Sequence, residues 1–478
     1  MAMESWSNES PSRRAFLKRA AALGALGTAA PLAMNLAAFG EAAAFTATDY
    51  KALVCVFLYG GNDYANTVIP YDNANYDLYN RIRIGGANRT NGGIAYGQNE
   101  LTATALTPLT PQTLTDNIRY ALNPSLTGLT SLWKTGQAAV MLNVGPLIAP
   151  LTVAQYNAGN APSRPIPPRL FSHNDQQSTW QSDGPEGTPI GWGGRIGDLA
   201  LSSNGSSLLT CISVAGNAVF LAGQNASVYR IGSSGPVAVT GLTGSSFLTA
   251  SAKAALQNLV TQSSGQVLEN EYNKVLARSI SLQSQVSGAL SSVALTTNFT
   301  PSGVSNSLSD QLKVVARLIA ARNSLNVKRQ VFFVSLGGFD HHDYLMKDHP
   351  PLMAKVNEAM SAFYRATVEM GIANQVTAFT ASDFGRTLAS NGDGSDHGWG
   401  SHHFVVGGAV RGGQFYGTAP RVSVTSDDQV GQGRLLPSTA ADQYAATLAR
   451  WFGVADTELI TVMPNIANFN TRTLGFMG

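Results

Sequence analysis

The chain has 478 residues, of which 44% are hydrophobic and only 13% are charged, and its formal net charge is +2 at pH 7. This length can bury one large core or two. The near balance of basic and acidic residues excludes the electrostatic footprint of a nucleic-acid-binding protein. Two cysteines, Cys55 and Cys211, lie in apolar runs and predict small buried side chains rather than a disulfide framework.

The N-terminus has the pattern of an export signal. Residues 12–18 read SRRAFLK, an Ala-, Leu- and Gly-rich stretch follows to about residue 39, and residues 42–44 (AAA) form a cleavage site. We therefore predict a signal peptide over residues 1–44, recognised by the twin-arginine export machinery, and a periplasmic or secreted protein. An uncleaved anchor is the alternative, which Pro31 and Asn35 disfavour by interrupting the apolar run. No later stretch is apolar for long enough to span a bilayer.

The mature chain, residues 45–478, is predicted to be a single α/β domain. Residues 51–59 form a continuous apolar run, which is typical of a parallel strand covered on both faces. Residues 71–98 lack a clear period and predict a surface loop. Helical spacing within residues 122–136 and a second apolar run at 138–144 complete a crossover unit of strand, helix and strand.

The rest of the chain continues the alternation. A helix is predicted at 191–199, short β-prone runs within 208–243 predict a small β excursion over the sheet, and two amphipathic helices are predicted within 247–292. The further strands are expected at 331–336, 375–379, 404–406 and 414–416, and the further helices at 311–321, 351–370 and 440–451. The pattern predicts a doubly wound, mostly parallel central sheet flanked by helices.

Acids and histidines gather where predicted strands end. Asp63 follows the first strand, Asp340 and His342 follow the strand at 331–336, and Asp383 follows the strand at 375–379. The glycine-rich stretch after Asp383 adds Asp396, His397 and His402, with His403 beside the last of these. Carboxylate and imidazole ligands without thiolate predict one or two divalent metal ions, namely Zn, Mn, Mg or Ca. The alternative is a solvated polar rim whose acids cap helices and turns.

Ser172 lies where a helix is predicted to begin, with Asp175 three residues later as in a capping box. It either caps the helix or presents its hydroxyl to a crevice at a helix N-terminus, where anions are favoured. In a two-metal site, Ser172 would attack a phosphoryl or sulfuryl centre, and Arg195 or Arg386 would neutralise its oxygens. Metal-bound water is the alternative nucleophile, and pairing with a carboxylate is the alternative role for Arg195.

These motifs, taken in order, resemble a secreted bacterial family called domain of unknown function 1501. The resemblance rests on SRRAFLK, GGND at 60–63, the Ser172–His173 pair, GWGGR, GGFDHH at 337–342, ASDFGRT, and SDHGWGSHHFVVGGAVRGG. It covers nearly all of the mature chain. The family is placed with alkaline phosphatases and sulfatases, so the resemblance implies an alkaline phosphatase-like fold with metal ligands at strand ends.

The superfamily's site residues carry over position by position. Asp63 resembles the metal aspartate of the first strand, Asp340 and His342 resemble the next acid and imidazole, and Asp383 matches a Ser-Asp-His-Gly motif in which Phe384 replaces the histidine. His397 resembles the last histidine, or Asp396 and His397 together restore the ligand that Phe384 lacks.

The resemblance also bears on the reaction. Residues up to Ser172 resemble the sulfatase lead-in to its nucleophile, but the Cys/Ser-Pro-Arg motif is not matched there, which argues against a formylglycine sulfatase. The resemblance implies an exported metal-dependent hydrolase of phosphate or sulfate esters on a small molecule, glycan or lipid. The rival is a non-catalytic exported protein of envelope or surface assembly that keeps the fold.

Overall fold

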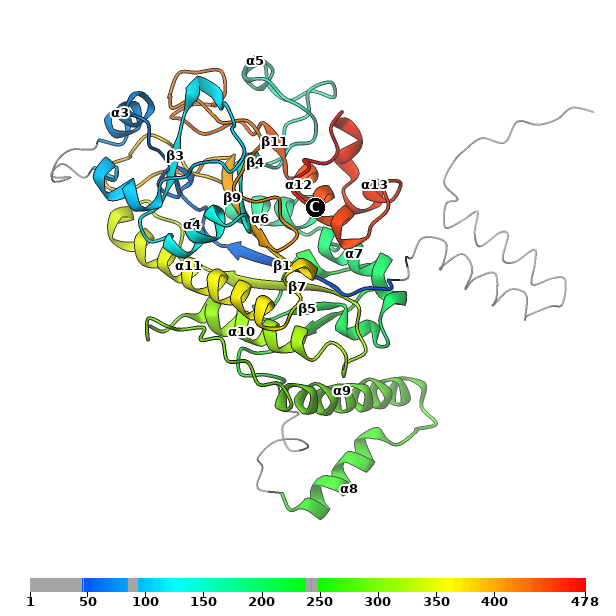
Figure 1. Ribbon diagram of the computed structural model, residues 1–478. Helices are drawn as coiled ribbons and strands as arrows, with labels where there is room; N and C mark the ends of the chain where they lie inside the picture. The colour runs from blue at the N-terminus through cyan, green and yellow to red at the C-terminus, as the bar shows by residue number, and fades with distance from the viewer. Residues whose placement is uncertain (1–44, 46, 85–92, 238–241, 243–247) are drawn as a thin grey trace, which may run out of the picture.

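The computed structural model describes residues 45, 47–84, 93–237, 242 and 248–478; the predicted signal peptide at 1–44 lies outside them. A nine-stranded sheet crosses the molecule in the order β10-β4-β9-β8-β1-β7-β5-β6, and β11 also pairs with β4 (Figure 1). Its strands are β1 (Lys51–Leu58), β4 (Ala138–Gly145), β5 (Cys211–Ser213), β6 (Val228–Arg230), β7 (Arg329–Leu336), β8 (Val376–Ser382), β9 (Ser401–Gly407), β10 (Phe415–Tyr416) and β11 (Thr439–Ala440). A separate antiparallel pair joins β2 (Val68–Pro70) to β3 (Tyr120–Leu122).

The sheet is mostly parallel, because only β9 runs against its neighbours β8 and β4. Strand β1 lies between β7 and β8, and Leu58 is in register with Leu336 of β7 and with Ser382 of β8. These three central strands therefore end at the same level. The residues that follow them are brought to one edge of the sheet, as the sequence predicts.

Helices cover both faces of the sheet. Side chains of β1 alternate between two apolar cores: Ala52, Val54 and Val56 pack into one, and Leu53, Cys55 and Phe57 pack into the other. Helices α4 (Thr127–Lys134), α10 (Ser307–Ala320) and α11 (Leu345–Glu369) contribute to the first core, and α6 (His173–Ser182), α7 (Trp192–Ala200), α12 (Ala441–Phe452) and α13 (Leu459–Val462) to the second. A strand buried on both faces needs the continuous apolar run that β1 has. Cys55 and Cys211 are free and buried, as predicted.

Three details differ from the sequence-based expectations. The predicted surface loop at 71–98 contains helix α3 (Asn73–Ile82), which the Asp72 side chain caps by accepting from Asn75 N. Strands β5 and β6 extend the main sheet, because β5 pairs with β7 and with β6, so the expected β excursion is wrong. Runs of three residues are too short to show which sheet they join. Strands β8 and β9 lie between β1 and β4 in the sheet, so the connection from β1 to β4 crosses both of them.

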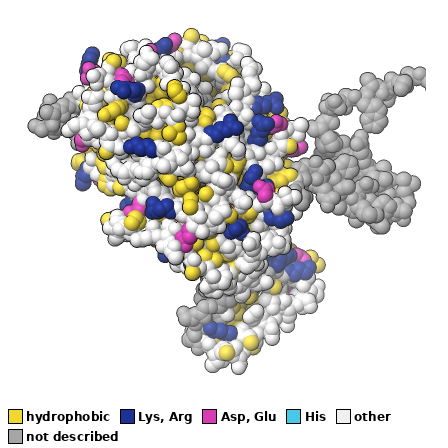
Figure 2. Space-filling model, in the orientation of Figure 1, with side chains coloured by type: hydrophobic (Ala, Val, Ile, Leu, Met, Phe, Trp, Pro, Cys, Tyr) yellow, Lys and Arg dark blue, Asp and Glu magenta, His cyan; other side chains and the backbone are white. Residues whose placement is uncertain are grey.

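Helices α8 (Ala250–Thr261) and α9 (Val267–Ser291) confirm the two helices expected within 247–292. They lie beyond α10, at the bottom of Figure 1, and α8 has no buried residue. A short helix, α5 (Val153–Asn157), lies in the connection between β4 and α6. Lys and Arg side chains are scattered over the face in Figure 2, in keeping with the balanced charge. None of the helices in the described ranges combines the length and hydropathy that crossing a membrane requires.

Candidate metal centre

The ends of β1 and β7 pack against each other closely enough to require glycine. Gly60 has φ +116°, and a Cβ atom there would lie 2.4 Å from the Asp340 backbone nitrogen. Gly60 N donates to Oδ1 of Asp383, which follows β8. The turn after β1 therefore holds the acids that follow β7 and β8 together. Asp383 is completely buried, whereas the Asp340 side chain is 45% exposed at the surface of the same edge.

Two histidines from other elements meet Asp340 there. His173 is the first residue of α6, and its Nε2 lies 3.4 Å from Asp340 Oδ2. His397 lies on the loop before β9, and its Nε2 lies 3.3 Å from Asp340 Oδ1. One ligand atom from each of His173, Asp340 and His397 fits within a span of 4.8 Å. His342 is adjacent, with its Nε2 at 2.9 Å from His397 Nε2 and 3.2 Å from Asp340 Oδ1.

The opposite side of each imidazole is held by an oxygen acceptor. His173 Nδ1 lies 2.7 Å from Asp383 Oδ2, and His397 Nδ1 lies 2.7 Å from the Phe171 carbonyl oxygen. His342 Nδ1 lies 3.3 Å from Asp396 Oδ1. Because a carbonyl or an ionised carboxylate can only accept, each Nδ1 carries the proton. The Nε2 atom of each ring faces Asp340, and an acceptor on the other ring nitrogen is how proteins orient metal-binding histidines.

A buried arginine stands behind Asp340. Arg386 Nη1 donates to Asp340 Oδ1 at 2.8 Å and to the Gly60 carbonyl at 3.0 Å, and Nε donates to the Ser395 carbonyl at 3.0 Å. Partial burial raises the pKa of Asp340, but the hydrogen bond and charge of Arg386 outweigh it, so this pKa lies below its ordinary value. The hydrogen bond to Asp383 raises the pKa of His173, whereas burial lowers the pKa of His397.

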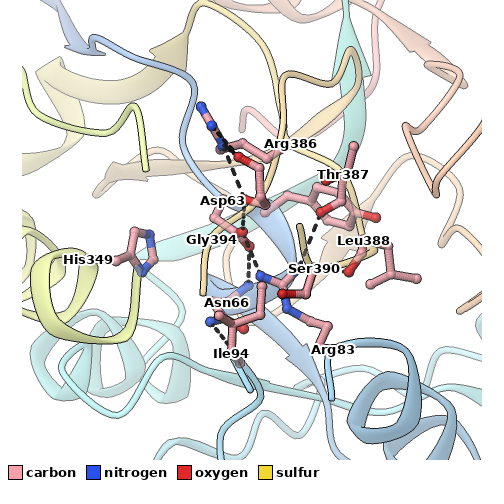
Figure 3. A network of polar contacts seen from close by, with 12 residues as sticks. Asp63, Asn66, Arg83, Ile94, His349, Arg386, Thr387, Leu388, Ser390 and Gly394 are labelled. Atoms are coloured by element: carbon pink, nitrogen blue, oxygen red, sulfur yellow. Dashed lines mark hydrogen bonds and ion pairs between the residues drawn. The ribbon is translucent and has the colours of Figure 1, made fainter. Parts of the chain in front are cut away.

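Asp63 lies apart from this cluster, in a buried ion pair. Its Oδ2 is 2.6 Å from Arg83 Nη2 and accepts from Ser395 Oγ at 2.9 Å, and its Oδ1 accepts from Asn66 N at 2.8 Å. Both charged side chains are fully inaccessible. Arg83 ends helix α3 and also donates to the carbonyls of Thr387 and Leu388 (Figure 3). The acceptor positions of Asp63 are thus occupied by protein donors, and it is not among the residues that converge on Asp340.

Three other predicted site residues form hydrogen bonds with groups other than the side chains of His173, Asp340 and His397. His402 is buried in β9, where Nδ1 accepts from Asn143 N at 3.0 Å, and burial lowers its pKa to about 3. Arg195 donates to the Val462 carbonyl at 3.0 Å, next to α13. Ser172 is the residue before α6, as predicted, but its Oγ donates to Asp175 Oδ2 at 2.8 Å and does not make the expected capping bond to the backbone.

The structure therefore brings together Asp340, His342, Asp383, Asp396 and His397 from the predicted set, with Arg386 beneath them. His173 is the contributor that the sequence left out, although it follows Ser172 directly. The Phe384 ring packs against both histidines, with its centroid 4.8 Å from that of His173 and 4.6 Å from that of His397, and the two imidazole centroids are 4.4 Å apart. An apolar ring thus occupies the position next to Asp383 and supports both imidazoles.

One family model matches most of the chain. The family described as protein of unknown function (DUF1501) matches residues 50–452. The chain belongs to this family. The DUF1501 match spans β1, β7, β8 and the loop with His397, so it includes every element of the centre. No curated protein matches the chain in sequence.

Three solved structures resemble this DUF1501 protein weakly, each with 10% sequence identity. Ps i-CgsB in complex with k-i-k-neocarrahexaose and Ps i-CgsB alone give TM-scores of 0.35 and 0.33, and each alignment covers 89% of this chain and 78% of that chain. A Bacteroides thetaiotaomicron protein, BT33494S-sulf, from work on the metabolism of multiple glycosaminoglycans, gives 0.31 and covers 86% and 74%. Similarity this low carries no argument about the present chain.

Proposed function

We propose that this protein is an exported, metal-dependent hydrolase of phosphate or sulfate esters, with one divalent cation held by His173, Asp340 and His397. The observation that carries the proposal is the shared orientation of the imidazoles. Each has its Nδ1 fixed by an oxygen acceptor and its Nε2 directed towards one half-exposed carboxylate. Protein scaffolds use this arrangement for ligation.

The donor set fits a cation. His173 Nε2 is buried and lacks a hydrogen-bond partner, since its 3.4 Å approach to Asp340 Oδ2 is not aligned for one. The Nε2 atoms of His342 and His397 lie 2.9 Å apart while both Nδ1 atoms face acceptors, so either a proton or a cation must lie at the two Nε2 atoms. Two imidazoles and one carboxylate favour Zn or Mn over Mg or Ca, and three protein ligands leave a position open for substrate. The proposed set does not include Asp63 or His402.

The residues of the centre have distinct proposed roles. His173, Asp340 and His397 bind the cation, Asp383 and the Phe171 carbonyl orient the imidazoles, and Arg386 fixes Asp340. A bound cation would supply polarisation of the ester oxygen and stabilisation of the charge that develops in the transition state. His342 and Asp396, both partly exposed beside the ligands, remain available for a second ion or for contacts with substrate.

Ser172 is the proposed nucleophile. It directly precedes His173, and its Oγ already donates to Asp175 Oδ2, a buried carboxylate that can take the proton. The Oγ atom would form a bond to phosphorus or sulfur while the ester bond breaks, and the departing alkoxide would take a proton from water. Water would then cleave the seryl ester and restore the hydroxyl group.

The assay for this proposal is turnover of chromogenic aryl phosphate and aryl sulfate esters by the purified protein, repeated with each candidate divalent cation. We expect turnover that depends on the cation, and we expect Ser172→Ala to abolish it while metal content is retained. Normal turnover in Ser172→Ala would transfer the nucleophilic role to water. A protein that binds metal but hydrolyses neither ester class with any cation would contradict the hydrolase.

We also propose that the domain, residues 45–478, has an alkaline phosphatase-like fold. Its support is the position of the candidate centre at the carboxyl ends of β1, β7 and β8, where doubly wound sheets bind ligands. Export by the twin-arginine route to the periplasm or beyond remains a proposal that rests on residues 12–18 and 42–44.

One observation favours a second candidate function, a non-catalytic exported protein that keeps one structural cation. Phe384 fills the place where a further histidine is expected, and Asp63 is committed to Arg83, so ligands for a second ion are reduced. The ester assay separates the two candidates, because a structural cation would raise thermal stability without supporting turnover.

A further inference from the structure

The loop before α6 has an unusual backbone where it meets His397. Phe171 has φ +74° and Arg169 has φ +47°, left-handed conformations that bulky side chains rarely adopt. Such backbone persists where surrounding contacts enforce it, often at functional sites. In this loop the left-handed backbone places the Phe171 carbonyl oxygen 2.7 Å from His397 Nδ1, from which it accepts a hydrogen bond.

The same two residues hold an arginine. Arg434 Nε donates to the His397 carbonyl at 2.7 Å, its Nη1 donates to the Gly431 carbonyl at 3.4 Å, and its guanidinium carbon lies 5.4 Å from the centre of the Phe171 ring. Phe171 and His397 are therefore joined twice, once directly and once through Arg434. These contacts hold the guanidinium of the half-buried Arg434 side chain in place before any ligand binds. Less side-chain conformational entropy is therefore lost on binding.

The side-chain hydrogen bonds of Arg434 go to carbonyl oxygens. Its charge acts on Asp396, but among the described residues it forms no ion pair with a carboxylate within 4.0 Å. Nη2 thus keeps its donors for another acceptor. The other two arginines considered from the sequence differ, because Arg386 is fully buried against Asp340 and Arg195 donates to Val462 on a different part of the molecule.

We propose that Arg434 is an anion-binding residue of the centre, which binds the oxygens of a tetrahedral oxyanion, phosphate or sulfate, beside His397. This inference rests on the proposed hydrolase, since the oxyanion is the group that is transferred. A guanidinium offers parallel N–H donors that match two oxygens of such a group. The planar guanidinium lies over the Phe171 ring, which restricts its movement.

The test measures binding of inorganic phosphate, and separately of inorganic sulfate, to metal-loaded protein by isothermal titration calorimetry. Arg434→Met should weaken binding of the preferred anion about ten- to hundred-fold and leave metal content unchanged. Arg434→Lys should restore part of the affinity, because it keeps the charge but loses the planar fork. Arg421→Met is the matched control: Arg421 lies on the same connection between β10 and β11 but pairs with Asp427, and we expect wild-type affinity.

The outcomes separate this inference from the proposed function. Metal-loaded Arg434→Met that binds both anions as tightly as wild type overturns the role of Arg434 and leaves the hydrolase standing. Equal losses of anion affinity in Arg434→Met and Arg421→Met would also overturn it, because the affinity would then depend on the net charge of the protein and not on the position of Arg434. Wild-type protein that retains no metal contradicts the proposed centre itself, and the inference falls with it. The comparison of phosphate with sulfate identifies which ester class the centre takes.

Discussion

Replacing Asp63 with Asn tests whether this residue belongs to the metal centre or to the buried ion pair with Arg83. Asparagine has nearly the same shape, and its Oδ1 can still accept from the Asn66 amide. The NH2 group that replaces Oδ2 no longer accepts from Ser395 Oγ or pairs with Arg83. Arg83 would then be an unpaired buried charge, with carbonyls of Thr387 and Leu388 at 3.3 and 3.2 Å as its acceptors. Removing one partner from a pair of this kind costs about 3–5 kcal/mol of unfolding free energy.

A double-mutant cycle isolates the pair. Asp63→Asn and Arg83→Met are each expected to lower the unfolding free energy strongly, whereas the double variant leaves no unpaired charge. The loss in the double variant should therefore be smaller than the sum of the two single losses by about 2–3 kcal/mol. Unfolding in urea, followed by circular dichroism at fixed protein and metal concentration, gives the three free energies. Metal content of each folded variant, measured by mass spectrometry, should equal that of wild type.

The pH dependence of this variant has a definite sign. Burial raises the pKa of Asp63, and the charge of Arg83 more than reverses that effect, so the folded-state pKa lies below the ordinary value of 3.8. The pair therefore contributes fully above the unfolded-state pKa, and its contribution is lost as the pH falls through the folded-state value. The stability difference between wild type and Asp63→Asn should be constant near neutrality and shrink in acid. Loss of metal in Asp63→Asn without loss of stability would refute the ion-pair role.

Three further outcomes are expected. Asp383→Asn should weaken metal binding about 10- to 100-fold in an equilibrium competition with a chelator, because it alters the partner that orients His173; unchanged affinity would mean that Asp383 has no orienting role. Burial raises the pKa of the Cys55 and Cys211 thiols, so native protein should not react with a thiol reagent and urea-unfolded protein should show two reactive thiols; rapid reaction of folded protein would contradict their burial. Changing Arg13 and Arg14 to Lys should retain the precursor in the cytoplasm, as seen by fractionation, and normal export would exclude the twin-arginine route.

The central strands could be predicted because burial on both faces leaves a strong signal. Residues 51–58 and 331–336 have continuous apolar runs, and the acids after them had to meet once the strands were parallel and neighbouring. Strands β5 and β6 have three residues each, which is shorter than any periodicity can reveal. The central strands and the edge strand β10 could thus be predicted, but the pairing of β5 and β6 with the main sheet could not.

The partner of Asp63 could not be found from the sequence. Arg83 lies at the end of a short helix in a stretch rich in Asn and Gly, and nothing in that stretch shows which acid it will meet. The local sequence of an aspartate after the first strand is the same whether its carboxylate is free to bind metal or is paired with an arginine. Only the packing of α3 against the strand ends distinguishes them (Figure 3).

The histidines divide for a geometric reason. His397 lies before β9 at the edge where the ligands meet, but β9 is antiparallel and runs away from that edge, with a rise of about 3.3 Å per residue. His402 and His403 are therefore carried into the sheet and buried, although they follow closely in sequence. His173, which is distant in sequence, is brought to the edge by the start of α6.

The most direct measurement is the metal content of purified protein and of two matched histidine variants, determined after equilibration with the candidate divalent cations. Wild type should retain about one cation per chain, in keeping with three protein ligands and an open position. His173→Ala should lose it, whereas His402→Asn, which keeps an acceptor for the Asn143 amide, should retain it. Retention of the cation by folded His173→Ala, together with its loss from folded His402→Asn, would contradict the proposed centre.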